Sequence, residues 1–130
     1  MVIKAPEQQL YDAMFITSQN MGYDTYQEKP QEATYPFVEL DYVQMVPRAT
    51  KSQILGTVHM QLNVWGLRSD RKTVSDMTFN LFRAARFLKM TGSEKWRMDI
   101  ERSDYQILKV TTEANEKLYR GQIEIAMNIN

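Results

Sequence analysis

The chain has 130 residues, of which 43% are hydrophobic and 25% charged, values that fit one globular domain and argue against a disordered or fibrous protein. Sixteen basic and sixteen acidic residues cancel, so the chain lacks the bulk positive charge that attracts a nucleic-acid backbone or an anionic membrane. The absence of cysteine excludes disulfides, thiolate nucleophiles and sulfur-ligated zinc. With neither an apolar signal core nor a membrane-length apolar stretch, we expect residues 1–130 to form a single domain that is made and used in a cytoplasm.

The first predicted element is a helix between Pro6 and Met21. Pro6 suits the first turn of a helix, Gly22 is a stop signal, and the apolar positions between them fall on one stripe. The polar stretch 23–33 is expected to be mainly a connector, with a short strand over 23–27 as an alternative.

A strand is predicted from Phe37 to Met45. Pro36 pushes the preceding residue into extended backbone, and apolar and acidic residues then alternate with a period of two. Residues 47–56, PRATKSQILG, have no periodicity and predict a long loop between two antiparallel strands. Loops of this length are often functional or mobile, although a plain surface loop is an equally good interpretation.

The unit from Thr57 to Lys89 is expected to be the core of the fold. Strict alternation over 57–65 predicts a half-buried strand with Leu62 among its inward residues. After Gly66, a cap at Ser69 or Asp70 precedes a run with helical spacing that extends to Lys89, and Gly92 is expected to be the end signal of this helix.

Three further strands are predicted, over 96–100, 105–112 and 120–129, with a polar turn at 113–117 between the last two. The order of elements predicts an α+β fold. It consists of a largely antiparallel sheet of four to five strands with two main helices packed on one face.

Candidate catalytic residues are few. His59 is the only histidine and lies on the polar side of its strand, which favours a structural role and excludes a pair of histidine metal ligands. The pairs Glu39/Asp41 and Asp99/Glu101 have the spacing to share one strand face, as a magnesium or acid–base site requires, but charged solvent-facing strand residues are more common. No nucleotide-binding glycine motif is present. We therefore expect no enzymatic activity, metal or cofactor.

The predicted long helix carries more apolar surface than one sheet face covers. Phe79 and Phe82 lie off the main stripe, and Arg83 and Arg86 give the same region a basic character. These four residues are candidates for a subunit interface. The alternative is that the first predicted helix covers them.

Several segments, in their order and spacing, resemble one family. They are YPFVEL at 35–40, a strand ending in LNVWG at 62–66, RKTVSDMTFNLF at 71–82 and YRGQIEI at 119–125. Together they resemble the tail-completion, or tail-terminator, proteins of long-tailed bacteriophages, and the N-terminal pattern LYDAMF extends the likeness over about residues 7–129.

The resemblance implies a non-enzymatic virion protein that caps the head-proximal end of the tail tube as a homo-oligomeric ring of six copies. The implied partners are its own copies, the tail-tube protein and the head-connector or head-closure protein, with no membrane. DNA would pass through the ring without sequence-specific contact. The implied location is the head–tail junction of the virion, after assembly in the host cytoplasm.

By the same resemblance, the predicted loop faces the tube or the lumen of the ring. Its candidate interface residues are Pro47, Arg48, Lys51, Gln53, Ile54 and Leu55. Three alternatives stay open: another neck subunit such as a head-closure or adaptor protein, a small host-directed binding protein, and a metal-dependent nuclease built on the carboxylate pairs.

Overall fold

The computed structural model describes residues 3–50 and 54–130, which form two helices, seven strands and two short 3-10 turns. The helices are α1 (Pro6–Asn20) and α2 (Arg71–Phe87). The strands are β1 (Thr25–Tyr26), β2 (Phe37–Ala49), β3 (Ile54–Leu67), β4 (Met90–Thr91), β5 (Glu94–Met98), β6 (Asp104–Thr111) and β7 (Lys117–Ile129). Neither helix in this part of the chain is long and apolar enough to cross a membrane.

All seven strands belong to one sheet with the order β1-β2-β3-β7-β5-β4, and β6 also pairs with β7. β6 lies along the first part of β7 and β5 along its last three residues, so both share one edge of β7. Every pairing is antiparallel except that of β1 with β2. The sheet is therefore larger than the predicted four to five strands, because β4 and β1 are two-residue strands too short to show a period.

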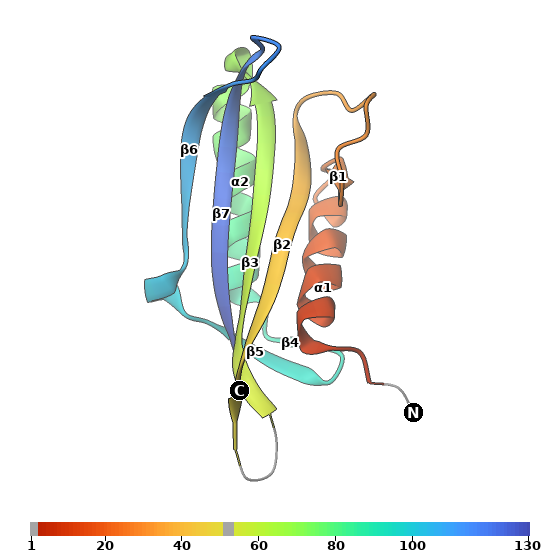
Figure 1. Cartoon of the computed structure of the whole chain (residues 1–130), viewed down its shortest axis with the longest axis vertical. Helices are drawn as coiled ribbons and strands as arrows, with labels where there is room; N and C mark the ends of the chain where they lie inside the picture. Colours follow the sequence, from red (N-terminus) through yellow and green to blue (C-terminus); the bar gives the residue numbers. More distant parts are fainter. Residues whose placement is uncertain (1–2, 51–53) are drawn as a thin grey trace.

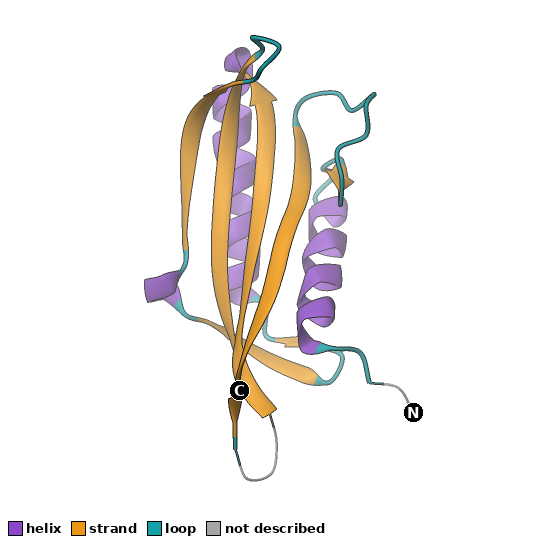
Figure 2. Cartoon of the chain, in the orientation of Figure 1, coloured by secondary structure: helices purple, strands orange, loops and turns teal. Residues whose placement is uncertain are grey.

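Both helices cover the same face of this sheet (Figures 1 and 2), so the predicted class of an α+β fold with two helices on one face is confirmed. One apolar cluster joins Leu10 and Met14 of α1 to Leu81 and Ala85 of α2. The inward residues of β3 and β7 complete it: Val58, Met60, Leu62, Val64, Ile123, Ile125 and Met127, each at most 1% exposed. Within residues 3–50 and 54–130, the opposite face of the sheet carries no helix.

Close packing of α2 on the sheet depends on two glycines. A Cβ at Gly121 in β7 would lie 1.9 Å from Oγ1 of Thr78 in α2, and a Cβ at Gly66 in β3 would lie 2.4 Å from Cγ2 of Val74. Both distances are far below van der Waals contact, so any larger residue at either position has to displace the helix or its side chains.

One predicted helix end is confirmed and the other is wrong. Gly22 ends α1, with a φ of +86° and an N–H that donates to the Gln19 carbonyl over 2.9 Å. α2 ends at Phe87, because Leu88 takes an extended conformation with a ψ of 122°. Gly92 instead occupies the turn between β4 and β5, with a φ of +44°.

The predicted loop at residues 47–56 is largely a β-hairpin. β2 and β3 pair as far as Pro47 with Gly56, Arg48 with Leu55 and Ala49 with Ile54. A shift of register between Leu40 and Val43 marks a bulge in β2. In Figure 1 this hairpin extends beyond the rest of the molecule. The prediction of an unpaired loop was wrong here, and residues 51–53 lie outside the described part of the chain.

Candidate functional site

The helix-free face of the sheet carries a network of polar side chains. At its centre is Asn63 of β3, which is only 1% exposed although no helix covers it. Nε of Arg120 donates to Oδ1 of Asn63 over 2.9 Å, and Nδ2 of Asn63 lies 3.3 Å from Oδ2 of Asp41. Nε1 of Trp65 donates to Oε1 of Glu39 over 3.2 Å. The three strands β2, β3 and β7 thus contribute side chains to one hydrogen-bonded layer, which we call the polar layer.

The same layer continues around Glu124 of β7. Its carboxylate accepts hydrogen bonds from Nε2 of Gln61 and, over 2.8 Å, from the hydroxyl of Tyr42. The bond to this carboxylate, with burial second, raises the pKa of Tyr42 to about 12, because the protonated phenol is the form that donates. Tyr42 follows Asp41 at the bulge in β2, where one residue of β3 faces two of β2.

The carboxylate pairs do not form one metal site. Glu39 and Asp41 lie in the polar layer, whereas Asp99 precedes and Glu101 lies within the short 3-10 turn Ile100–Arg102 between β5 and β6. Asp99 is 3.7 Å from Nε of Arg102. Across residues 3–50 and 54–130, no three His, Asp or Glu side chains are grouped so that they could hold a metal ion. The nuclease hypothesis therefore finds no metal site in this part of the chain.

His59 lies on the polar side of β3, opposite Gln44 of β2 and Ala126 of β7. It is half-buried.

Four of the six predicted interface residues of the hairpin lie on paired strands. Pro47 and Arg48 are exposed on β2, and Leu55 on β3 is half-buried against the edge of the core. Ile54 begins β3. Lys51 and Gln53 lie outside the described residues.

Two of the four predicted interface residues of α2, Phe79 and Phe82, lie against Tyr105 of β6. Phe79 is 48% exposed, and its ring centre lies 6.4 Å from that of Tyr105 in β6. Phe82 is half-buried, with its ring centre 5.1 Å from the same tyrosine. Arg83 is exposed and lies over the ring of Phe87, with Cζ 5.9 Å from the ring centre. The candidate Arg86, on the last turn of α2, is exposed.

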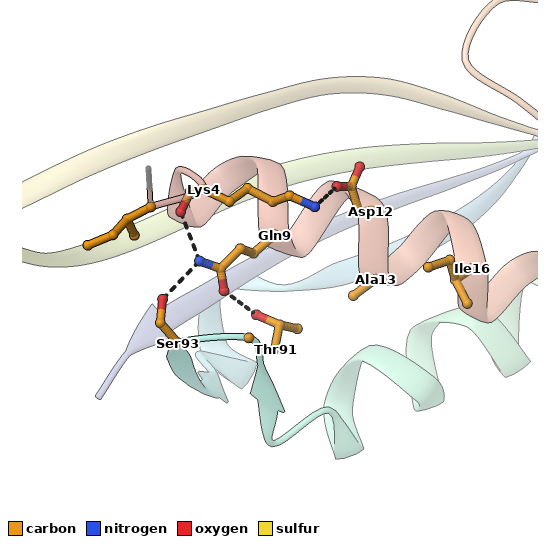
Figure 3. A pocket seen from close by; sticks show the side chains of 9 residues that line it. Lys4, Gln9, Asp12, Ala13, Ile16, Thr91 and Ser93 are labelled. Atoms are coloured by element: carbon orange, nitrogen blue, oxygen red, sulfur yellow. Dashed lines mark hydrogen bonds and ion pairs between the residues drawn. The ribbon is translucent and has the colours of Figure 1, made fainter. Parts of the chain in front are cut away.

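A groove of about 510 Å³ separates α1 from the turn between β4 and β5 (Figure 3). Gln9 crosses its inner end, where Nε2 donates to Oγ of Ser93 over 3.0 Å and Oε1 accepts from Oγ1 of Thr91 over 3.1 Å. The groove is bordered by Ile3 and Ile16, which are 71% and 55% exposed. The chemistry of the groove suits an apolar side chain. The hydrophobic periodicity of the sequence did not predict the groove, because its walls come from two segments, around Gln9 and Thr91, that lie 82 residues apart.

A second, smaller cavity of about 170 Å³ lies at the edge of the polar layer, and we call it the aromatic pocket. Its walls are Tyr35, Phe37, Glu39, Trp65, Thr112 and Leu118, and Lys29 lies at its rim. Nζ of Lys29 is 5.2 Å from the ring centre of Tyr35 and 5.9 Å from that of Phe37. This pocket was not predicted from the sequence, in which the only signal for it is the density of aromatic residues in 23–37.

The sequence matches no protein-family profile and no curated protein sequence. The structure is similar to that of a chain in the virion of a native gene transfer agent particle, with a TM-score of 0.66 at 10% sequence identity. The similarity covers 96% of this chain and 94% of that chain. The two chains therefore share a fold over nearly their whole lengths.

Proposed function

We propose that the chain is a non-enzymatic structural protein of a phage or phage-like virion. We further propose that it caps the head-proximal end of the tail tube as a ring of six copies and joins the tail to the head connector. The observation that carries the proposal is the shared fold with a chain of a virion particle, which spans nearly all of both chains. The ordered motifs that resemble tail-completion proteins support the same function from the sequence.

The two sides of the sheet favour contacts between copies. Along the outer edge of β2, β1 pairs only with Val38 and Glu39, and β6 pairs with β7 alone. In the described structure, the rest of both outer edges has no strand partner. An exposed edge is a template for contacts with another chain, and two different edges permit a head-to-tail interface that closes into a ring.

The projecting hairpin is the proposed contact with the tube or the lumen. Its candidate residues keep the roles assigned from the sequence. Pro47, Arg48, Ile54 and Leu55 lie on the paired strands, and Lys51 and Gln53 lie outside the described residues. Paired strands hold their backbone in one direction, so the hairpin can present Pro47, Arg48 and Leu55 at a fixed place relative to the sheet. DNA would pass the ring without sequence-specific contacts.

The test is negative-stain microscopy of the purified protein mixed with tail tubes that lack it. We expect a ring at one end of each tube. A matched variant that lacks residues 51–55 should stay folded by circular dichroism yet fail to join. Binding to the head connector but not to tubes would favour the adaptor or head-closure alternative, and binding to neither would favour the host-directed alternative.

A further inference from the structure

We propose that the aromatic pocket is the receptor for an arginine side chain from helix α2 of the neighbouring copy, and that Lys29 occupies it as a placeholder in the free subunit. The inference rests on the proposed ring, because it names the contact that closes it. It assigns a ligand chemistry, a guanidinium group, to a cavity of this chain.

The pocket has the composition of a cation site. Tyr35, Phe37 and Trp65 contribute aromatic rings, whose faces attract a positive charge, and Glu39 supplies a carboxylate. The ring of Trp65 already attracts one guanidinium of this chain, since Cζ of Arg120 lies 5.4 Å from its centre, and its indole N–H donates to Glu39. The hydroxyl of Tyr35 donates to Oε1 of Glu116 over 2.8 Å, which places a second carboxylate close to the same ring. The walls are built in advance, since Phe37 is 1% exposed and its ring centre is 5.3 Å from that of Tyr35.

Lys29 shows which chemistry the pocket accepts and is held in a way that permits exchange. Its ammonium lies over two rings and donates to the Tyr35 hydroxyl over 3.2 Å, but it makes no ion pair with the described carboxylates. The side chain is exposed, on a connector without helix or strand between β1 and β2. A planar guanidinium stacks on aromatic rings and is more weakly hydrated than an ammonium, so arginine is the better ligand.

The source of the arginine follows from the uneven charge of a chain that is neutral overall. Residues 24–41, which include a wall of the pocket, hold five acidic residues and one basic residue. Residues 68–89, which include α2, hold six basic and two acidic residues. These segments lie on different parts of the fold, with β1 beside β2 at one edge and α2 behind β3 and β7 (Figure 1). Head-to-tail contact between copies therefore sets an acidic side against a basic side.

Arg86 is the best-placed ligand on α2. It is exposed and makes no ion pair within the described residues, whereas Arg83 already packs over the ring of Phe87. Both arginines belong to the candidate interface on this helix, and the proposal gives Arg86 the role of the inserted side chain and Arg83 a flanking role.

The first test measures ligand binding without any ring. Arginine amide is titrated into the ¹⁵N-labelled protein while the indole N–H signals of Trp65 and Trp96 are followed by NMR. Trp65 lines the pocket, whereas the indole of Trp96 donates to Oγ1 of Thr91 and serves as an internal control. We expect a saturable shift of the Trp65 signal alone, at a lower ligand concentration in Lys29→Ala than in the wild type. An unchanged Trp65 signal in both proteins would overturn the inference.

The second test measures the contact between copies. Arg86→Ala should raise the subunit concentration for half-maximal capping of tail tubes about tenfold, which corresponds to ~1.4 kcal/mol per interface. Lys29→Ala should lower that concentration. The matched controls are Lys95→Ala, an exposed base on β5, and Glu101→Gln, an exposed acid in the 3-10 turn between β5 and β6.

The outcomes separate the two proposals. Unchanged capping by a folded Arg86→Ala protein refutes the arginine contact and leaves the ring intact, and loss of capping in Lys29→Ala refutes the placeholder role. Absence of capping by the wild type refutes the proposed function, while the NMR titration still decides whether the pocket binds a guanidinium group.

Discussion

At Gly121, α2 approaches β7 so closely that a Cβ atom has no room between them. Substituting Gly121→Ala would place a methyl group 1.9 Å from Oγ1, 3.1 Å from Cβ and 3.4 Å from Cγ2 of Thr78. Thr78 is fully buried in the middle of α2, so its side chain cannot move out into solvent. Overpacking of this kind costs typically 1–3 kcal/mol, offset in part by about 0.4–1 kcal/mol from the less flexible unfolded chain. Because the 1.9 Å approach puts this clash near the top of its range, we expect a net destabilisation of about 2 kcal/mol.

The companion change Thr78→Ala tests whether that clash is the cause. It removes Oγ1 and Cγ2, and Oγ1 is a buried atom without a hydrogen-bond partner in the described structure. Removing an unsatisfied buried hydroxyl offsets part of the packing lost with the methyl group, so Thr78→Ala alone should change stability by less than about 1 kcal/mol. In the double variant the contact that remains is the 3.1 Å approach of two Cβ atoms, which a small shift relieves.

The assay is urea denaturation of the wild type, both single variants and the double variant, followed by circular dichroism. We expect the double variant to recover at least ~1 kcal/mol relative to the sum of the single changes, as residues in direct contact do. In thermal melts the Gly121→Ala loss should appear as a drop of roughly 6–10 °C, at roughly 3–5 °C per kcal/mol for a chain of this length. Additive effects of the two substitutions would show that α2 does not pack against β7 in the way described.

Three further predictions concern the core and the polar layer. Leu62→Ala should destabilise the protein by about 2–5 kcal/mol in the same denaturation assay, because Leu62 is fully buried; a negligible change would mean that the faces of β3 are reversed. Asn63→Ala should cost about 1–3 kcal/mol, because it leaves Nε of Arg120 without its 2.9 Å acceptor, and a loss no larger than that of an exposed-site control such as Gln106→Ala would contradict this. The hydrogen bond to Glu124 raises the pKa of Tyr42 to about 12. The contribution of this bond to the free energy of unfolding is therefore complete below about pH 10, the ordinary pKa of tyrosine, and is lost as the pH rises through about 12. An ultraviolet titration of Tyr42→Phe should therefore lack one late-ionising phenol relative to the wild type, and loss of an ordinary phenol near pH 10 would contradict the hydrogen bond to Glu124.

The sequence predicted those elements whose burial imposes a period. β3 and α2 were found because one side of each faces the core, which forces a period of two in the strand and of 3.6 in the helix. The projecting hairpin of β2 and β3 was missed for the same reason. Its described residues 47–49 and 54–56 lie at or beyond the edge of the core, so burial does not require them to alternate. Their pairing is fixed by backbone hydrogen bonds that any residue type except proline can donate.

The polar layer was predicted as a solvent-facing surface. The side of the strands was predicted correctly, but the burial of its central residues was not. Asn63 and Gln61 do point away from the core, but they are 1% and 8% exposed because larger neighbours such as Trp65 and Arg120 surround them. Alternation reports which side of a strand a residue occupies. It does not report which side chains from other strands meet there, and the same limit hid the aromatic pocket.

The polar layer and the aromatic pocket together bear on when a ring subunit should assemble. In both places a side chain of the same chain already makes the contact. Arg120 donates a hydrogen bond to Asn63, and the ammonium of Lys29 lies over the rings of Tyr35 and Phe37. A copy that docks on such a surface has to replace bonds that already exist, so the net gain from each pairwise contact is small. In the proposed ring, the six contacts on a tube end would act together, since each subunit would be held from two sides and by the tube. This arrangement would disfavour association of free subunits in solution and favour it where a tube end supplies the template.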